Sequence, residues 1–389
     1  MPLRRLTLKN LLSFGPDGLS LDLEPLNILI GPNGSGKSNL LDGIELLKCA
    51  PEQLTAPIRS GGGIRNWIWG RQPGPTACVE AILENPQDGR HLLRHRIEFD
   101  ESEQAFRLVD ERIENSRPDP GFNDAFFFYR YQNGRPALAV KNNDNRRQLQ
   151  REDVADDESI LSQRKDPDQY PELAHLNSLY GGISLYRDWG FGRKAPFRQP
   201  QSTDVRPTPL REDFSNLGMF LNRMRQEPRT KSNLIDCLTD AYEGLSDFEL
   251  NFEGGTVQVF FSEGDLAVPA TRLSDGSVKY LCLLAILLNP HPPPIVCIEE
   301  PEMGMHPDLL PKIADLLVEA SQHCQLIVTT HSDALVDALS EQPESIVVCE
   351  KQNGNTSMNR LDPKDLDDWL KKYRLGELWT KGQLGGVRW

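Results

Sequence analysis

The sequence lacks long apolar runs and has few cysteines. None of its 389 residues lies in a stretch that approaches the roughly 20 apolar residues of a membrane-spanning helix. The segment from Met1 to Arg5 does not begin a secretion signal. The seven cysteines form no Cys-x-x-Cys pair, which argues against a disulfide or metal framework and for reduced thiols. We therefore expect a cytoplasmic protein without a membrane segment.

Acidic residues outnumber basic ones, and the net charge at pH 7 is −14. This balance disfavours indiscriminate binding of nucleic acid and favours a protein or small-molecule partner, although a basic groove could still form on assembly. Three basic clusters are each more typical of a solvated face than of a DNA contact. They are Arg90/Arg94/Arg96, Arg146/Arg147/Arg151 and Arg193/Lys194/Arg198.

The pattern of apolar residues predicts an α/β fold. Leu26 to Ile30 is a continuous apolar run, as in a strand buried on both faces, and a helix is expected from Lys37 to about Lys48. From Leu273 onward helices alternate with strands. The expected strands are Ile295–Ile298, Gln325–Thr329 and Ser345–Cys349. This alternation predicts a parallel or mixed sheet covered by helices.

The middle of the chain has two further patterns. Residues 76–132 hold short strand-like runs broken by turn signals, which predicts an antiparallel lobe. A helical face is formed by Leu217, Phe220, Leu221 and Met224, and Thr256–Phe261 and Leu266–Ala270 are expected to be strands. We expect a core of residues 1–165 and 265–389, including the antiparallel lobe at about 76–140, and an inserted helical region over 166–264.

A phosphate-loop pattern lies between the first buried strand and its helix. Gly31-Pro32-Asn33-Gly34-Ser35-Gly36-Lys37-Ser38 matches G-x-x-x-x-G-K-[ST]. Glycines let backbone N–H groups point at phosphate oxygens, Lys37 would reach the β- and γ-phosphates, and the Ser38 hydroxyl would bind Mg²⁺. A chance glycine-rich turn is the alternative, and the flanking strand and helix disfavour it. The expected binding residues are Asn33, Gly34, Ser35, Gly36, Lys37, Ser38 and Asn39.

Two later strands end in side chains suited to ATP chemistry. Ile295–Ile298 is followed by Glu299 and Glu300, at the strand edge where open α/β sheets bind ligands. One carboxylate can hold Mg²⁺ and the other can orient or deprotonate a water molecule. His331 follows the next strand, where a γ-phosphate sensor would lie; a structural hydrogen-bonding histidine is the alternative.

Ser274 and Gly276 stand at the start of the apolar helix Val278–Leu288. Ser274 is a good N-cap, and the same helix start could bind a second phosphate group. Trp67 and Trp69 are more typical of core residues than of a ligand contact.

With these motifs in this order, the chain resembles ABC-type ATPases of the SMC, RecF and OLD (overcoming lysogenization defect) group, over roughly residues 1–80 and 265–350. The signature segment would be Leu273-Ser274-Asp275-Gly276-Ser277, and the D-loop would be Met303 to Pro307. The resemblance implies an ABC-type P-loop head with a mixed or parallel sheet, an antiparallel β lobe and an inserted helical lobe.

The resemblance also implies roles for single residues. Glu300 would be the catalytic base, assisted by Lys37 and His331. Mg²⁺ would be held by Ser38, Glu299 and Gln163, with Gln163 as the Q-loop glutamine unless it is a surface residue. Ser274 and Gly276 would act on ATP held by a second subunit.

Several departures from the family pattern bear on function. Glu299 replaces the more usual Asp, and Asp275 and Ser277 differ from the transporter signature. We expect neither long coiled-coil arms nor a TOPRIM nuclease domain in this sequence. We expect a slow ATPase that dimerises around ATP and works as a switch, with a separately encoded nuclease or toxin in a bacterial anti-phage module. A RecF-like repair ATPase that binds duplex DNA is the alternative, and a transporter motor or a GTPase is disfavoured.

Overall fold

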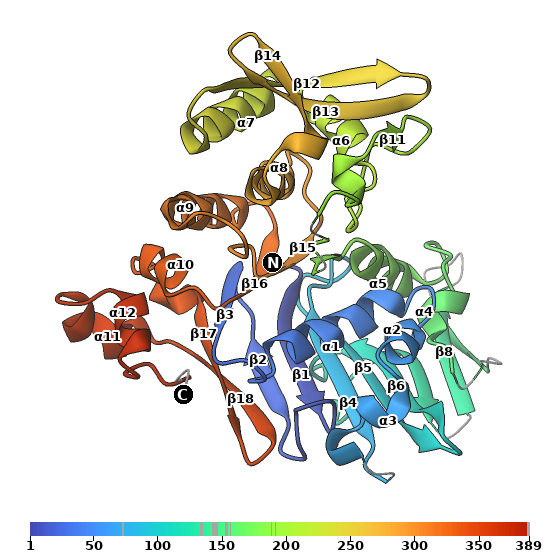
Figure 1. The fold of residues 1–389 in the computed structure, drawn as a ribbon. Helices are drawn as coiled ribbons and strands as arrows, with labels where there is room; N and C mark the ends of the chain where they lie inside the picture. The colour runs from blue at the N-terminus through green and yellow to red at the C-terminus, as the bar shows by residue number, and fades with distance from the viewer. Residues whose placement is uncertain are drawn as a thin grey trace. The chain divides into compact units, whose positions relative to one another are not determined.

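The computed structural model (Figure 1) describes residues 1–71, 74–132, 135–141, 147–151, 155, 157–187, 189–190 and 192–386. Arg146 and the residues from Val387 to Trp389 lie outside these ranges. The chain divides into two compact units. The first unit comprises Met1–Ile183, Glu344–Asp362 and Gly382–Trp389, and the second comprises Ser184–Pro343 and Pro363–Lys381.

The larger sheet of the first unit has eight strands in the order β2-β1-β4-β5-β6-β7-β8-β9, and every pair in it is antiparallel. Residues alternate between buried and half-buried along β5, as the period of a strand requires. The predicted antiparallel lobe is confirmed. The strands are β1 Leu3–Lys9, β2 Leu19–Asp22, β4 Ala77–Leu83, β5 Leu93–Ser102, β6 Ala105–Asn115, β7 Phe127–Gln132, β8 Arg135–Lys141 and β9 Arg147–Arg151.

A second group of strands in the first unit carries the phosphate loop. β3 (Leu26–Ile30) is buried at all five positions and pairs in parallel with β17 (Ile346–Gln352). β17 then turns through Asn353 and Gly354 into the antiparallel β18 (Asn355–Arg360). Both turn residues have positive φ, 51° and 81°, which is the conformation that Asn-Gly hairpin turns adopt.

Helices cover one face of the large sheet in the first unit (Figure 1). α1 (Lys37–Cys49) follows β3, as predicted, and contacts α2 (Ala56–Ser60) and α5 (Pro171–Gly181). Leu40, Leu41, Ile44 and Leu47 give α1 its buried side. The remaining helices are α3 Ile64–Trp67, η1 Trp69–Arg71 and α4 Ile160–Gln163.

A buried polar network fixes the start of α4. Glu111 on β6 is completely buried and accepts hydrogen bonds from the Ser159 hydroxyl and, at 3.0 Å, from the Ile160 N–H. Its other neighbour is His95, whose Nε2 lies 3.1 Å away and whose Nδ1 lies 3.0 Å from the Tyr180 hydroxyl. Because each buried polar group here has a partner, the network ties the β lobe to the short helix that carries Gln163.

The C-terminal segment of the first unit packs on β17. The N–H of Gly386 donates to Glu350 Oε1 at 2.6 Å. The position of a Cβ on Gly386 would lie 3.6 Å from the Cα of Gly31, the first glycine of the phosphate loop. This segment therefore docks beside the phosphate loop.

The second unit contains a parallel sheet of β10 (Ser184–Tyr186), β15 (Ile295–Glu299) and β16 (Gln325–Thr330). The predicted alternation of helix and strand is confirmed here, because α8 (Asp275–Leu287) precedes β15 and α9 (Leu310–Ala320) connects it to β16. The remaining elements around it are η4 Pro307–Leu309, α10 Asp333–Ala338, α11 Pro363–Leu370 and α12 Leu375–Thr380. η5 (Pro343–Ser345) runs from the last residue of a second-unit segment into the first unit.

An antiparallel sheet and two helices complete the second unit. β12 (Leu245–Glu253) and β13 (Thr256–Glu263) form its centre, with β11 (Gln201–Ser202) and β14 (Leu266–Pro269) both on β13. The predicted apolar face of residues 217–224 is buried in α6 (Leu217–Met224). The other elements are α7 Pro228–Ala241, η2 Pro196–Arg198 and η3 Ala270–Arg272. No helix among the described residues is both long and apolar enough to cross a membrane.

Candidate functional site

The phosphate loop curls tightly between β3 and α1. A Cβ on Gly31 would lie 2.3 Å from the Cys349 carbonyl oxygen, and a Cβ on Gly36 would lie 2.4 Å from Thr356 Oγ1. Both glycines also have positive φ, 149° and 102°. A side chain at either position would collide with β17 or β18. The fold therefore requires glycine at the two positions where the sequence pattern has it.

Polar groups inside the loop match the chemistry of a phosphate. Lys37 is buried, and its ammonium group donates to the carbonyl oxygens of Gly31 at 2.8 Å and Pro32 at 3.1 Å. Ser35 is 1% exposed, and its hydroxyl has no hydrogen-bond partner among the described residues. A buried ammonium, an unpartnered buried hydroxyl and a helix N-terminus are groups that an anion satisfies.

The structure places the other predicted binding residues on the same loop and on the first turn of α1. Asn33 and Gly34 are exposed at the loop tip, and Ser38 is exposed on α1. Asn39 donates to Ser13 Oγ at 2.7 Å. Gln163 lies at the end of α4, where its amide donates to Glu158 at 3.1 Å.

In the second unit, the expected metal-side carboxylate at the end of β15 is held from two sides. Arg187, just after β10, places its Nε 3.0 Å from Glu299 Oε2. The indole N–H of Trp189 donates to the Glu299 carbonyl oxygen at 2.6 Å. Sequence motifs gave no sign of either residue, because both lie far from Glu299 along the chain.

The expected catalytic base, Glu300, and the expected γ-phosphate sensor, His331, lie together. Glu300 Oε1 is 3.2 Å from His331 Nε2. Glu300 also has a φ of 48°, a left-handed conformation that is uncommon for residues other than glycine, and its N–H donates to the Thr329 carbonyl at 3.0 Å. Such strained backbone positions concentrate at functional sites.

Glu302 positions the segment that carries His331. It is largely buried, and its Oε1 accepts from the Thr330 hydroxyl at 2.6 Å and from the His331 N–H at 2.8 Å. Its Oε2 is buried without a partner among the described residues. Burial raises the pKa of this carboxyl group. No sequence motif pointed to this role of Glu302.

Lys279 connects α8 to the same acidic segment. It is 2% exposed, and its ammonium group donates to the Glu300 carbonyl at 3.0 Å and the Met303 carbonyl at 2.7 Å. The ammonium also lies 4.5 Å from the centre of the Trp189 ring. Burial lowers its pKa to about 8. Lys279 therefore links the helix of the signature segment to the D-loop.

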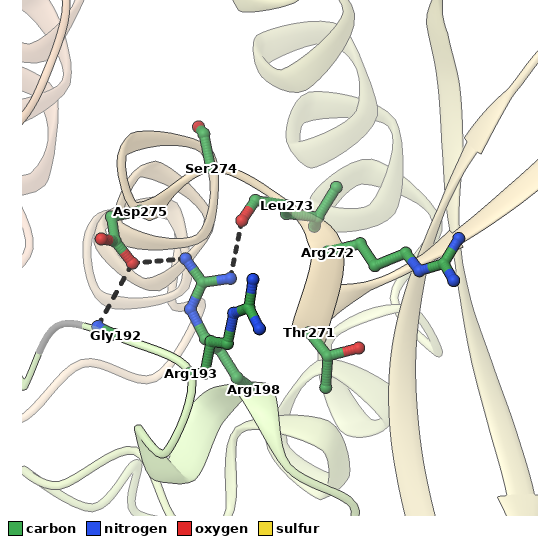
Figure 2. Close-up of a pocket in the computed structure, with 8 residues that line it drawn as sticks. All are labelled: Gly192, Arg193, Arg198, Thr271, Arg272, Leu273, Ser274 and Asp275. Atoms are coloured by element: carbon green, nitrogen blue, oxygen red, sulfur yellow. Dashed lines mark hydrogen bonds and ion pairs between the residues drawn. The ribbon is translucent and has the colours of Figure 1, made fainter.

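The start of α8 borders a cavity of about 750 Å³ (Figure 2). Ser274 Oγ accepts from the Ser277 N–H at 3.0 Å, so the N-cap prediction is confirmed. A Cβ on Gly276 would lie 2.8 Å from the Gly304 carbonyl oxygen. The residues that line the cavity are Gly192, Arg193, Arg198, Thr271, Arg272, Leu273, Ser274 and Asp275.

Arg198 corrects part of the sequence interpretation. It was expected in a solvated basic cluster but is 3% exposed. Its guanidinium donates to the carbonyl oxygens of Ala270 at 2.8 Å and Leu273 at 2.7 Å, and pairs with Asp275 (Figure 2). Arg198 therefore holds the backbone that leads into α8.

The predicted site residues thus form two groups, one in each unit. The loop residues and Gln163 belong to the first unit, whereas Ser274, Gly276, Glu299, Glu300 and His331 belong to the second. That both groups act on one nucleotide stays a prediction.

Comparisons with known proteins agree with the motifs. A family model described as "AAA domain, putative AbiEii toxin, Type IV TA system" matches residues 26–337. No curated protein matches the sequence.

Solved structures of SMC heads match nearly the whole chain. An SMC head bound to the C-terminal winged-helix domain of ScpA has a TM-score of 0.60 at 16% identity and covers 95% of this chain and 100% of its own. The Pyrococcus furiosus SMC head bound to the C-terminal domain of ScpA has a TM-score of 0.58 at 15% identity and covers 96% and 99%. The Pyrococcus yayanosii head reaches 0.52 at 14% identity and covers 96% and 99%. The predicted ABC-type P-loop head fold is confirmed.

Proposed function

The chain belongs to the AAA-domain family whose model matches residues 26–337, and on that premise we propose that it hydrolyses ATP slowly and uses the reaction as a switch. The observation that carries the proposal is the phosphate loop, in which Lys37 is buried and the Ser35 hydroxyl is buried without a partner among the described residues. The Glu300–His331 pair in the second unit supports hydrolysis as well as binding.

Each residue has a defined part in the proposed reaction. The loop N–H groups and Lys37 would bind the phosphates, and Ser38, Glu299 and Gln163 would hold Mg²⁺, which would supply positive charge to the triphosphate. Glu300 orients and deprotonates the attacking water, and His331 beside it senses the γ-phosphate. Arg187 and Glu302 keep Glu299 and His331 in place through the contacts described above.

The first test replaces the proposed base. Glu300→Gln keeps the size of the side chain and removes its basicity, so ATP hydrolysis is expected to fall ~10²–10⁴-fold. ATP binding is expected to persist, measured by titration calorimetry, whereas Lys37→Ala weakens it. Glu341→Gln, at an exposed position of the second unit, is the matched control. Hydrolysis by Glu300→Gln at the parental rate contradicts the assignment.

We further propose that two copies close around ATP, with Ser274 and Gly276 acting on the nucleotide of the other copy. Ser274 and Gly276 stand at the helix start that borders the 750 Å³ cavity, where a phosphate group would meet N–H donors. The family description names a putative AbiEii toxin of a toxin–antitoxin system, which supports a defence role. The proposal adds a separately encoded nuclease or toxin as partner and the cytoplasm as location.

The second test measures assembly. Light scattering of Glu300→Gln is expected to give twice the monomer mass with ATP and Mg²⁺ and the monomer mass without them, because slow hydrolysis traps the closed state. Adding Ser274→Arg, which fills the proposed contact, should abolish the doubling. Co-expression with adjacent reading frames then tests for the effector. A chain that stays monomeric with bound ATP contradicts the switch.

A further inference from the structure

A second cavity lies beside the phosphate loop, within the first unit. Its volume is about 420 Å³, and its lining includes Ser13, Asn39, Asn66, Trp69, Lys351 and Gly354. These residues come from the loop after β1, the first turn of α1, the segment around α3 and the β17–β18 hairpin. Of these lining residues, Asn39 alone is among the binding residues expected from the phosphate-loop pattern.

Hydrogen bonds connect this cavity directly to the loop. Asn39, next to the expected Mg²⁺ ligand Ser38, donates to Ser13 Oγ at 2.7 Å. Thr356 donates its hydroxyl hydrogen toward Ser13 Oγ at 2.7 Å or the Ser35 carbonyl oxygen at 2.9 Å. Ser13 and Thr356 also occupy the space that a Cβ on Gly36 would need. One wall of the cavity is therefore built on the last residues of the phosphate loop.

The two tryptophans of this region have different environments. Trp67 is 4% exposed and belongs to the core, as expected from the sequence. Trp69 is only half-buried and lines the cavity. The backbone N–H of Trp69 donates to the Asn10 carbonyl oxygen at 3.0 Å, and the backbone N–H of Leu12 donates to the Trp67 carbonyl oxygen at 2.6 Å. Backbone pairing thus fixes Trp69 against the loop after β1.

We propose that this cavity takes the nucleoside half of the nucleotide and that the base stacks on Trp69. The inference rests on the proposed nucleotide binding. A triphosphate seated in the loop has Lys37 at its β- and γ-phosphates, so its nucleoside leaves from the α-phosphate end, along the first turn of α1 where Asn39 stands. An aromatic ring held by backbone contacts gives a base a flat apolar surface.

The polar groups around the cavity suit the remainder of a nucleoside. Asn39 and Ser13 stand beside the phosphate loop, where a ribose would lie. Asn66 also lines the cavity, and its amide nitrogen donates to the Gly62 carbonyl oxygen at 2.9 Å. Lys351 is exposed at the rim. The cavity therefore combines one stacking surface with a few polar groups, as small-ligand sites do.

The experiment compares ATP with inorganic tripolyphosphate, which has the phosphates but no nucleoside. Trp69→Ala is expected to weaken ATP binding roughly 10-fold to 100-fold, the range for loss of one base-stacking contact. Tripolyphosphate binding should remain at the parental level, and Trp69→Phe should restore most of the ATP affinity. Trp369→Ala, on an exposed tryptophan of α11, is the matched control.

A second variant protects the test against misfolding of Trp69→Ala. Gly354 has a φ of 81° and no atom within 4 Å of an added Cβ. Gly354→Asn adds a side chain at the cavity, and asparagine is among the residue types that adopt positive φ with the least backbone strain. It should lower ATP affinity and spare tripolyphosphate. Parental ATP affinity in both variants overturns the proposal, as does an equal loss of both ligands. If the parent binds neither ligand, nucleotide binding itself is wrong.

Discussion

Single residues outside the motifs hold the motif residues in place. Arg187 and Trp189 contact Glu299, Glu302 contacts the His331 segment, and Lys279 contacts the carbonyl oxygens of the D-loop. Lys279 stands out, because it is an amine buried in an otherwise apolar helix. Its desolvation is partly offset by two carbonyl acceptors and the Trp189 ring.

The free energy of unfolding is expected to change with pH because the buried amine of Lys279 titrates. Burial lowers its pKa to about 8 in the folded chain, from the usual lysine value of 10.5 in the unfolded chain. Between these values the unfolded chain binds the proton and the folded chain does not, so this group makes stability rise with pH across that window. Chemical denaturation from pH 7 to 10.5 should show the parent gaining up to roughly 3 kcal/mol relative to Lys279→Met.

The control for this titration is Lys372→Met, at an exposed position. Its stability curve should run parallel to that of the parent. Parallel curves for the parent and Lys279→Met would mean that the buried amine does not titrate in this window.

The contrast between Lys37 and Lys279 shows what a sequence pattern can predict. Lys37 stands in a contiguous motif whose backbone geometry is local, so its place in the loop could be predicted from the sequence. Lys279 acquires its role from Glu300 and Met303, which come near only when α8 packs beside the end of β15. The same holds for Arg187, because no local rule pairs it with Glu299.

Helices and strands were predictable where their apolar residues form a continuous run or follow the period of one buried face. β3 and β15 are buried over most of their length, and α6 has the apolar face that its sequence predicts. β12 was missed although Phe248, Leu250 and Phe252 alternate with polar residues. Most of its residues are exposed or half-buried, so it lacks the continuous apolar run that marked β3 and β15. β17 was predicted as the strand Ser345–Cys349, but β18 and the hairpin turn between them were missed, although Asn353-Gly354 is a strong hairpin signal.

The contact between α8 and the D-loop is expected to depend on Gly276. An added Cβ would lie 2.8 Å from the Gly304 carbonyl oxygen, closer than real Cβ atoms approach. Gly276→Ala should therefore lower the free energy of unfolding by about 1–3 kcal/mol, as overpacking does. Urea denaturation measures this change.

Gly181→Ala is the matched control, because Gly181 ends α5 and an added Cβ would meet no atom within 4 Å. This variant should be neutral or more stable, since alanine is the better helix former. Equal effects of the two substitutions would contradict the close contact at Gly276.

At the scale of the whole molecule, each unit is assembled from segments that are distant in the sequence. The first unit takes β3 from the start of the chain and β17 and β18 from near its end. The SMC-head fold was predictable because the motifs kept their order at both ends of the chain. Sequence identities of 14–16% to the solved heads show that this fold persists with few shared residues.

The docking of Gly386 on β17 has a practical consequence. Gly386 lies against Gly31 of the phosphate loop. A purification tag or fluorescent protein fused after Trp389 would therefore start only a few residues along the chain from this contact. Affinities measured on such fusions would include the influence of the fused part. Fusions at the other end face a different constraint, since the amino group of Met1 pairs with Glu84 at 3.1 Å. A cleavable tag, removed before nucleotide titration, avoids both effects.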